Sequence, residues 1–167
     1  MTSPMCRICL AVLVLLMTGA ASAQENLNLR PPSDWELGYG PKETRDSMIM
    51  EYVKKGEKID SWTELVTIQQ FRRKSSPREF FDQLKGTRER ACPGVTEWRI
   101  VEEERNTVLY EWNTTAICDG EPAQWELARL LLGRNTGYRV AYTTRGQLGA
   151  ETRATWTDWL RSVSLGR

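Results

Sequence analysis

Alternating apolar and polar side chains run through most of the chain after residue 34 and predict a β-rich domain. Turn-forming and charged residues interrupt this alternation, so the pattern divides into seven strands. Residues 130–132 are three consecutive leucines, which indicates a strand that is covered on both faces. The predicted strands cover residues 35–39, 47–53, 62–71, 96–103, 107–115, 124–132 and 138–144.

The segment 76–91 has helical rather than strand spacing. Ser76 and Glu79 stand three positions apart around Pro77, the pattern of a capping box with proline at the first helical position. The helix is expected to end by residue 91, because Pro93 disfavours helical backbone geometry at Cys92. Cys92 is therefore predicted at the exit of this helix.

The strands at 96–103 and 107–115 form a predicted hairpin whose register can be argued. A three-residue loop ending at Asn106 would pair Trp98 with Trp112 and Ile100 with Tyr110. A two-residue loop would shift the pairing and separate the two tryptophans. We favour the first register, with Asn106 in the left-handed conformation that such a loop requires.

A second helix is predicted over residues 150–165, where Trp156, Leu160 and Val163 recur on one side. The resulting element order is β-β-β-α-β-β-β-β-α. The strands are mostly antiparallel and the two helices are widely separated in the sequence. This pattern predicts an α+β domain built on an antiparallel sheet of six to seven strands. We expect one helix on each face of this sheet, an α/β/α sandwich.

This order of elements resembles that of the PsbP-like α/β/α proteins. The resemblance concerns the element order and spacing over most of residues 35–165, and it assigns no role to any residue. Proteins of that fold include photosystem subunits, GTPase-binding proteins and secreted lipoproteins, so the resemblance implies binding rather than catalysis. The segments that carry it are residues 62–71 leading into 76–91, and the terminal pattern Trp156-x-x-Trp159-Leu160-x-x-Val163.

The first 23 residues have the pattern of a cleaved export signal. Arg7 precedes an apolar run over residues 8–17, and Ala21-Ser22-Ala23 follows as a small-x-small cleavage signature. The apolar run has about half of the roughly 20 residues that span a bilayer, which favours cleavage over a permanent anchor. Residues 24–34 are predicted to form a flexible leader, followed by a single domain over 35–167.

The charge and the cysteine content indicate the compartment of the protein and exclude some classes of partner. Cleavage removes Arg7 and leaves basic and acidic side chains equal in number, so we expect neither nucleic acid nor a membrane surface as a partner. Cys92 and Cys118 are the cysteines that remain, and in an oxidising compartment they are predicted to form a structural disulfide. The expected location is the periplasm of a bacterium, or otherwise the medium.

The chain contains no histidine, which excludes Ser–His–Asp and Cys–His catalysis and imidazole metal sites within it. Phosphate-binding loops, nucleophile elbows and zinc spacings are also absent from the sequence. We therefore predict no catalytic residue, metal or cofactor. The acidic run 102–104 is interpreted as a solvated hairpin turn rather than an acid–base pair or a Ca²⁺ site. Asn113 begins a glycosylation pattern that matters only in a eukaryotic secretory pathway.

Two features are candidates for contact with a ligand or partner. The basic cluster Arg72-Arg73-Lys74 precedes the first helix, where it could hold a phosphate or an acidic group, although such clusters are usually solvated loops. Seven tryptophans are present, and most are expected in the core. Trp35, next to the predicted leader, is the tryptophan expected to be exposed.

The leading hypothesis is an exported binding or interaction domain without enzymatic activity. One alternative is a histidine-independent enzyme, for instance a glycan hydrolase with two carboxyl groups about 5 to 9 Å apart in a cleft. Another is a structural subunit of an envelope complex, which would expose an apolar patch or a bare sheet edge.

Overall fold

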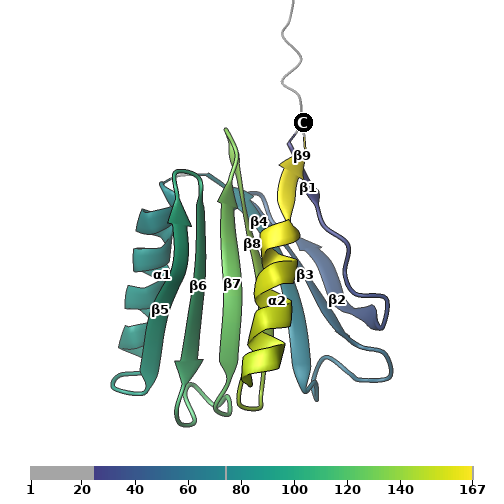
Figure 1. The fold of residues 1–167 in the computed structure, drawn as a ribbon, viewed down its shortest axis with the longest axis vertical. Coiled ribbons are helices and arrows are strands. Elements are labelled where there is room, and N and C mark those ends of the chain that lie inside the picture. The colour runs from purple at the N-terminus through teal and green to yellow at the C-terminus, as the bar shows by residue number, and fades with distance from the viewer. Residues whose placement is uncertain (1–24, 74, 167) are drawn as a thin grey trace, which may run out of the picture.

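The computed structural model describes residues 25–73 and 75–166, so the predicted export signal and Lys74 lie outside the described residues. The fold is α+β (Figure 1), with a large antiparallel sheet and two helices. The helices are α1 (Pro77–Ala91) and α2 (Ala150–Ser162). The strands are β1 (Asn26–Asn28), β2 (Trp35–Glu43), β3 (Ser47–Lys54), β4 (Glu64–Arg72), β5 (Thr96–Glu104), β6 (Thr107–Thr114), β7 (Trp125–Leu132), β8 (Thr136–Thr144) and β9 (Ser164–Gly166).

Seven strands form the main sheet in the order β2-β3-β4-β8-β7-β6-β5, and every neighbouring pair is antiparallel. The chain first builds the meander β2-β3-β4 and then passes through α1 to the opposite edge. From β5 it returns strand by strand until β8 pairs with β4. The predicted antiparallel sheet of six to seven strands is thereby confirmed.

The β5–β6 hairpin has the predicted register, with Trp98 opposite Trp112 and Ile100 opposite Tyr110. Its loop differs from the expectation, because Glu104 already pairs with Thr107 and only two residues remain between the strands. A bulge between Ile100 and Glu102 adds the extra residue within β5, which keeps the tryptophans opposite each other. Asn106 does not take up the expected left-handed conformation, since Asp119 is the one described non-glycine residue with positive φ.

Helix α1 begins as the sequence predicts. The Ser76 side chain accepts a hydrogen bond from the backbone N–H of Glu79, and the Glu79 carboxylate accepts one from the N–H of Ser76. Cys92 follows the last helical residue as the C-cap. Helix α1 packs on β5, β6 and β7, where the ring of Phe81 contacts those of Trp98 and Tyr110 edge-on.

Helix α2 ends at Ser162, three residues before the expected end, because the chain becomes extended at Val163 and continues into β9. The helix packs on β7 and β8. Trp156 stacks on Tyr142 of β8 with ring centroids 4.0 Å apart, and Leu160 is fully buried.

Two apolar clusters contain alternate residues of the central strands. Val108 and Leu130 belong to the cluster that includes Phe81 of α1, whereas Leu109 and Leu131 belong to the cluster that includes α2. Because successive strand residues point to opposite faces, both faces of β6 and β7 carry apolar contacts. The three leucines at 130–132 are all buried, as predicted for a strand covered on both sides.

The segment expected to be a leader without regular structure contains strand β1, which pairs antiparallel with β9. Leu27 and Leu29 pack against the cluster that includes α2. Figure 1 shows this short two-stranded ribbon beside the sheet, near the ends of β4 and β8. The N-terminal and C-terminal segments of the described chain are therefore held together by backbone pairing.

The predicted disulfide is confirmed: Cys92 is bonded to Cys118, with their Cα atoms 5.5 Å apart. It joins the end of α1 to the loop between β6 and β7, and both cysteines are buried. The bond indicates an oxidising environment. None of the described helices is long and apolar enough to cross a membrane.

Candidate functional site

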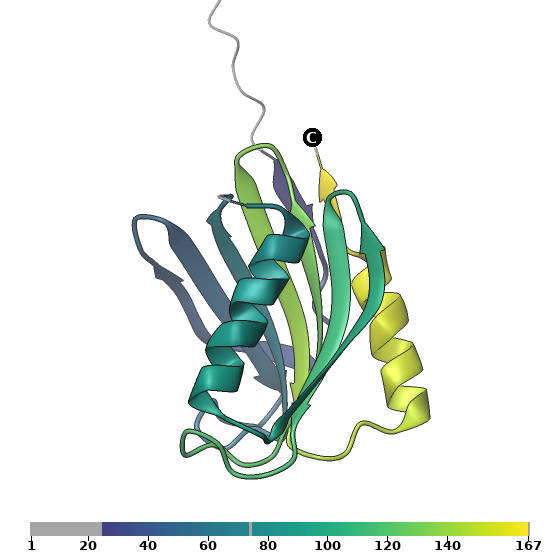
Figure 2. The same ribbon diagram turned by 90° about the vertical axis from the view of Figure 1, so that its left-hand side faces the viewer.

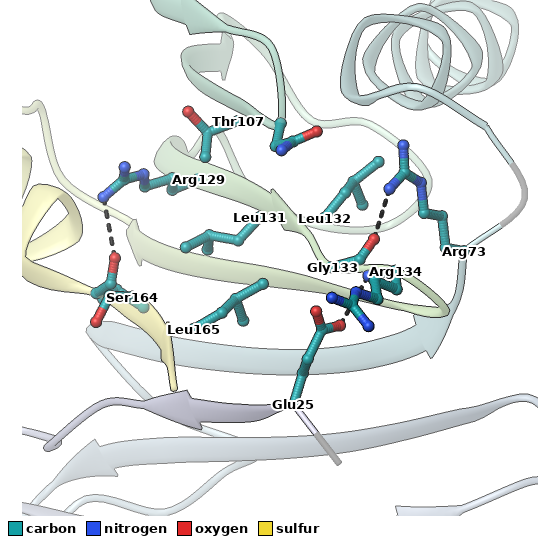
Figure 3. Close-up of a pocket in the computed structure, with 12 residues that line it drawn as sticks. Glu25, Arg73, Thr107, Arg129, Leu131, Leu132, Gly133, Arg134, Ser164 and Leu165 are labelled. Carbon is teal, nitrogen blue, oxygen red and sulfur yellow. Dashed lines mark hydrogen bonds between the residues drawn. The ribbon is translucent and has the colours of Figure 1, made fainter. Parts of the chain in front are cut away.

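A pocket of about 390 Å³ lies at the end of the sheet where β7 turns into β8 and where the β1–β9 ribbon approaches (Figure 3). Its floor is apolar, formed by Leu131 of β7 and Leu165 of β9, and Leu132 of β7 also lines it. Both β7 leucines are buried, and Leu165 is half-buried. The lining thus combines segments from both ends of the chain with the centre of the sheet.

Arg129 borders one side of this floor and is anchored at the C-terminal end of α2. Its Nη1 atom donates to the carbonyl oxygens of Leu160, Arg161 and Val163 at 2.9, 2.7 and 3.1 Å. The last carbonyls of a helix lack the usual partners of the next turn, so Arg129 caps the end of α2, where the Leu160 carbonyl also accepts the backbone N–H of Val163 at 3.3 Å. Burial lowers the pKa of Arg129, but a guanidinium remains charged at neutral pH.

Arg73 borders the other side, next to the turn between β7 and β8. Its Nη1 atom donates to the carbonyl of Gly133 at 2.5 Å, and its backbone N–H donates to the carbonyl of Asn135 at 2.9 Å. The guanidinium has five N–H groups, and the hydrogen bond to Gly133 uses one of them. Arg73 is half-buried, which leaves the other donors available to a ligand.

A carboxylate also reaches this turn, from the N-terminal segment. The Glu25 Oε2 atom accepts a hydrogen bond from the backbone N–H of Arg134 at 2.7 Å. The hydroxyl of Tyr138 donates to the backbone carbonyl of Glu25 at 3.1 Å, which fixes the residue beside the turn. Burial and the nearby Glu25 carboxylate raise the pKa of Tyr138, so this hydroxyl remains a donor at neutral pH.

Three arginines and one glutamate line the pocket, so cations exceed carboxylates there by two. In Figure 3 the side chains of Leu131 and Leu165 lie between Arg129 on one side and Arg134 and Glu25 on the other. A leucine floor with positive charges at its margin suits a molecule that has an aliphatic part and an anionic group.

The residues predicted to contact a ligand are not brought together by the fold. Arg73 lines the pocket, whereas Arg72 is exposed and approaches Asp46 at 3.9 Å outside it. Lys74 lies outside the described residues. The prediction that Trp35 is exposed is wrong: its side chain is 7% exposed, because it packs edge-on against Tyr142 and Trp156.

Glu25, Arg129 and Arg134 were not predicted as site residues from the sequence. A signal for the first was present, since Leu27 and Leu29 alternate with polar residues as in a strand. Arg129 is a charged residue between apolar residues of a predicted strand, which is unusual. This pattern does not indicate that the residue lines a pocket.

The acidic run and the glycosylation pattern of the sequence lie outside this pocket. Glu102 and Glu103 form ion pairs with Arg161 and Arg78 on the exposed surface. Asn113 is 4% exposed, so the folded chain does not present the glycosylation pattern to solvent. Among the described residues, no group of three or more acidic or cysteine side chains is placed to hold a metal ion.

An interior ionic cluster lies away from the pocket, on β6, β7 and β8. Glu126 Oε1 accepts hydrogen bonds from Trp112 Nε1, at 2.6 Å, and from the guanidinium of Arg139. Arg139 Nε donates to the hydroxyl of Tyr110 at 2.9 Å. Burial raises the pKa of Tyr110 to about 12. The partners of this cluster are protein groups, which indicates a structural role.

Glu51 of β3 is a half-buried carboxyl outside the pocket. Burial raises its pKa from the usual 4.5, and this effect exceeds the opposing hydrogen bond with Thr67 and the attraction of Arg139. The unfolded chain therefore releases the Glu51 proton at lower pH than the folded chain does. This difference makes the folded state less favourable as the pH rises above about 4.5.

Replacing Glu51 with glutamine should remove this pH-dependent loss. We expect the free energy of unfolding of Glu51→Gln, minus that of the unsubstituted protein, to be larger at pH 7 than at pH 4. Urea unfolding at the two pH values measures this difference. Glu97→Gln, on the exposed side of β5, serves as the control and should show no such pH-dependent difference. An equal effect of Glu51→Gln at both pH values would contradict the prediction.

Neither a family model nor a curated protein matches this chain.

Proposed function

We propose that this protein is an exported binding domain that takes up a small amphipathic anion in the pocket between the β7–β8 turn and the β1–β9 ribbon. The observation that carries the proposal is the pairing of a leucine floor with Arg73, Arg129 and Arg134 in one cavity of about 390 Å³. Ligand pockets of small molecules commonly have volumes of about 300 to 1,000 Å³.

Different regions of the pocket would contact the aliphatic part and the anionic part of such a ligand. An aliphatic chain would lie on the floor formed by Leu131 and Leu165, and the removal of its own methylenes from water contributes about 0.8 kcal/mol per methylene. The anionic group would lie at the margin, where the free donors of Arg73 can form charge-assisted hydrogen bonds. Arg129 contributes its charge while it holds the end of α2.

We further propose an α/β/α arrangement with one helix on each face of the sheet, as in the PsbP-like proteins. The division of alternate strand residues between the two apolar clusters supports it, and so does the position of α1 and α2 on either side of the strands in Figure 2. The export signal at residues 1–23 and a periplasmic location belong to the same proposal. They are supported by the signal pattern in the sequence and by the Cys92–Cys118 disulfide.

The test is a calorimetric titration with octanoate, octanesulfonate and octyltrimethylammonium, which share the alkyl chain and differ in charge. The two anions should bind and the cation should not. Arg73→Gln should weaken anion binding by about tenfold or more, since hydrogen bonds to a charged group contribute about 1.5 to 3 kcal/mol, which corresponds to about 10- to 150-fold in affinity. The neighbouring variant Arg72→Gln should have no effect, because Arg72 lies outside the pocket. Equal binding of all three probes, or equal effects of the two variants, would refute the proposal.

A further inference from the structure

The Glu25 carboxylate is unusually close to the β7–β8 turn. Besides the 2.7 Å hydrogen bond to the N–H of Arg134, this carboxylate lies directly over the Cα atom of Gly133. A Cβ atom built on Gly133 would lie 1.8 Å from Glu25 Oε2 and 2.6 Å from Glu25 Cδ. Any side chain at position 133 would therefore expel the carboxylate.

Space rather than backbone conformation explains the glycine at this position. Four described glycines, Gly40, Gly56, Gly94 and Gly120, have the positive φ angles that side chains disfavour, and Gly133 is not among them. Gly133 is also buried. The absence of a side chain at Gly133 thus permits the close approach of a carboxylate to the turn.

Positive charge surrounds this small site. Arg73 donates to the carbonyl of Gly133 itself, and both Arg73 and Arg134 line the same pocket as Glu25. A backbone N–H together with adjacent guanidinium groups is a favourable environment for an anion. The structure therefore contains a carboxylate already bound in the pocket, contributed by the chain itself.

We propose that the Gly133–Arg134 turn is a carboxylate-binding site, that Glu25 occupies it as an intramolecular ligand, and that an aliphatic monocarboxylate displaces Glu25 when it binds. This inference rests on the proposed function and names its ligand class. The carboxylate of the ligand accepts the Arg134 N–H bond, and its tail lies on Leu131 and Leu165. Glu25 thereby sets the affinity of the pocket.

Competition by Glu25 has a measurable consequence. An internal group that occupies the turn about nine-tenths of the time lowers the apparent affinity for an external carboxylate by about tenfold. Removal of the Glu25 side chain should therefore strengthen octanoate binding by about this factor. Pairing of β1 with β9 does not depend on this side chain, because it consists of backbone contacts.

The experiment measures octanoate binding to four proteins by calorimetry, with thermal unfolding of each as a check of folding. They are the unsubstituted chain, Glu25→Ala, the double variant Glu25→Ala/Gly133→Ala and the control Glu36→Ala. Glu36 is a matched control, since its Oε1 atom accepts the N–H of Gly56 at 3.1 Å in another turn. The amide resonance of Arg134, followed by NMR, reports directly on occupation of the site.

We expect Glu25→Ala to bind octanoate about tenfold more tightly, Glu36→Ala to be unchanged, and the double variant to lose this gain. Octanoate should shift the Arg134 amide resonance of Glu25→Ala. Equal octanoate affinity of Glu25→Ala and the unsubstituted chain would overturn the inference. If Arg73→Gln still weakened octanoate binding in that case, the proposed function would remain supported. A double variant as tight as Glu25→Ala would exclude the turn as the site. Absence of octanoate binding to all four proteins would overturn both proposals.

Discussion

Replacing Glu126 with leucine should destabilise the protein by about 3 to 5 kcal/mol, because it leaves the charge of Arg139 buried without its partner. The side chains of Glu126 and Arg139 are 7% and 13% exposed, so solvent cannot replace the lost carboxylate. The substitution also removes the acceptor of the Trp112 Nε1–H group. Urea unfolding of the oxidised protein measures the loss.

A double-mutant cycle separates the ion pair from its surroundings. Arg139→Met alone should be similarly destabilising, since it leaves the Glu126 carboxylate uncompensated and the Tyr110 hydroxyl without a donor. The double variant Glu126→Leu/Arg139→Met should recover much of the loss, because no buried charge remains, although Trp112 still lacks its acceptor. Additive losses in the double variant would contradict this account.

An exposed pair provides the comparison. Glu103 and Arg78 form an ion pair 2.7 Å apart, but their side chains are 39% and 48% exposed. Solvent screens such a pair, so Glu103→Leu should change stability by about 1 kcal/mol or less. A loss as large as that of Glu126→Leu would indicate that burial does not distinguish the two pairs.

Local signals in the sequence were sufficient for most of the elements. The capping box at Ser76 and Glu79 determines where α1 begins, and both partners are within three residues of each other. In the β5–β6 hairpin the aromatic pairing of Trp98 with Trp112 was a better guide than the loop length. The bulge in β5 compensates for the shorter loop, and no residue in the sequence marks it clearly.

Predictions failed where a partner distant in sequence decides the structure. Strand β1 forms because β9 pairs with it, and the residues of this pair come from opposite ends of the chain. The same spacing of Leu160 and Val163 suits a helix, so the change from α2 to β9 was not visible in the local pattern. Trp35 is buried by Trp156 of α2, a contact that no neighbour of Trp35 predicts.

The pocket combines these distant segments, which explains why only Arg73 was selected from the sequence. Arg73 drew attention because three basic residues are consecutive there, yet its neighbour Arg72 lies outside the pocket. Glu25 and Leu165 reach the site through the β1–β9 ribbon, whereas Arg129 and Gly133 reach it through β7 and its turn. Composition could exclude histidine chemistry, but it could not position these groups.

Removing the disulfide should have the other large effect on stability. Cys92 and Cys118 are 26 residues apart, and closing a loop of this length contributes about 3.5 kcal/mol in the chain-entropy model. We expect Cys92→Ala/Cys118→Ala to lose about this free energy of unfolding and to melt about 10 °C lower. Both cysteines are buried, so alanine avoids placing a new polar group in the interior.

This loss should leave the affinity of the pocket unchanged. The disulfide joins the end of α1 to the loop that precedes β7, whereas the pocket lies at the opposite end of β7, beside its turn with β8. Chemical reduction of the unsubstituted protein should reproduce the lower melting temperature of the double variant, and both should still bind octanoate with unchanged affinity well below that temperature. Loss of binding in the folded, reduced protein would show that the disulfide positions the pocket, and that the two ends of β7 are coupled.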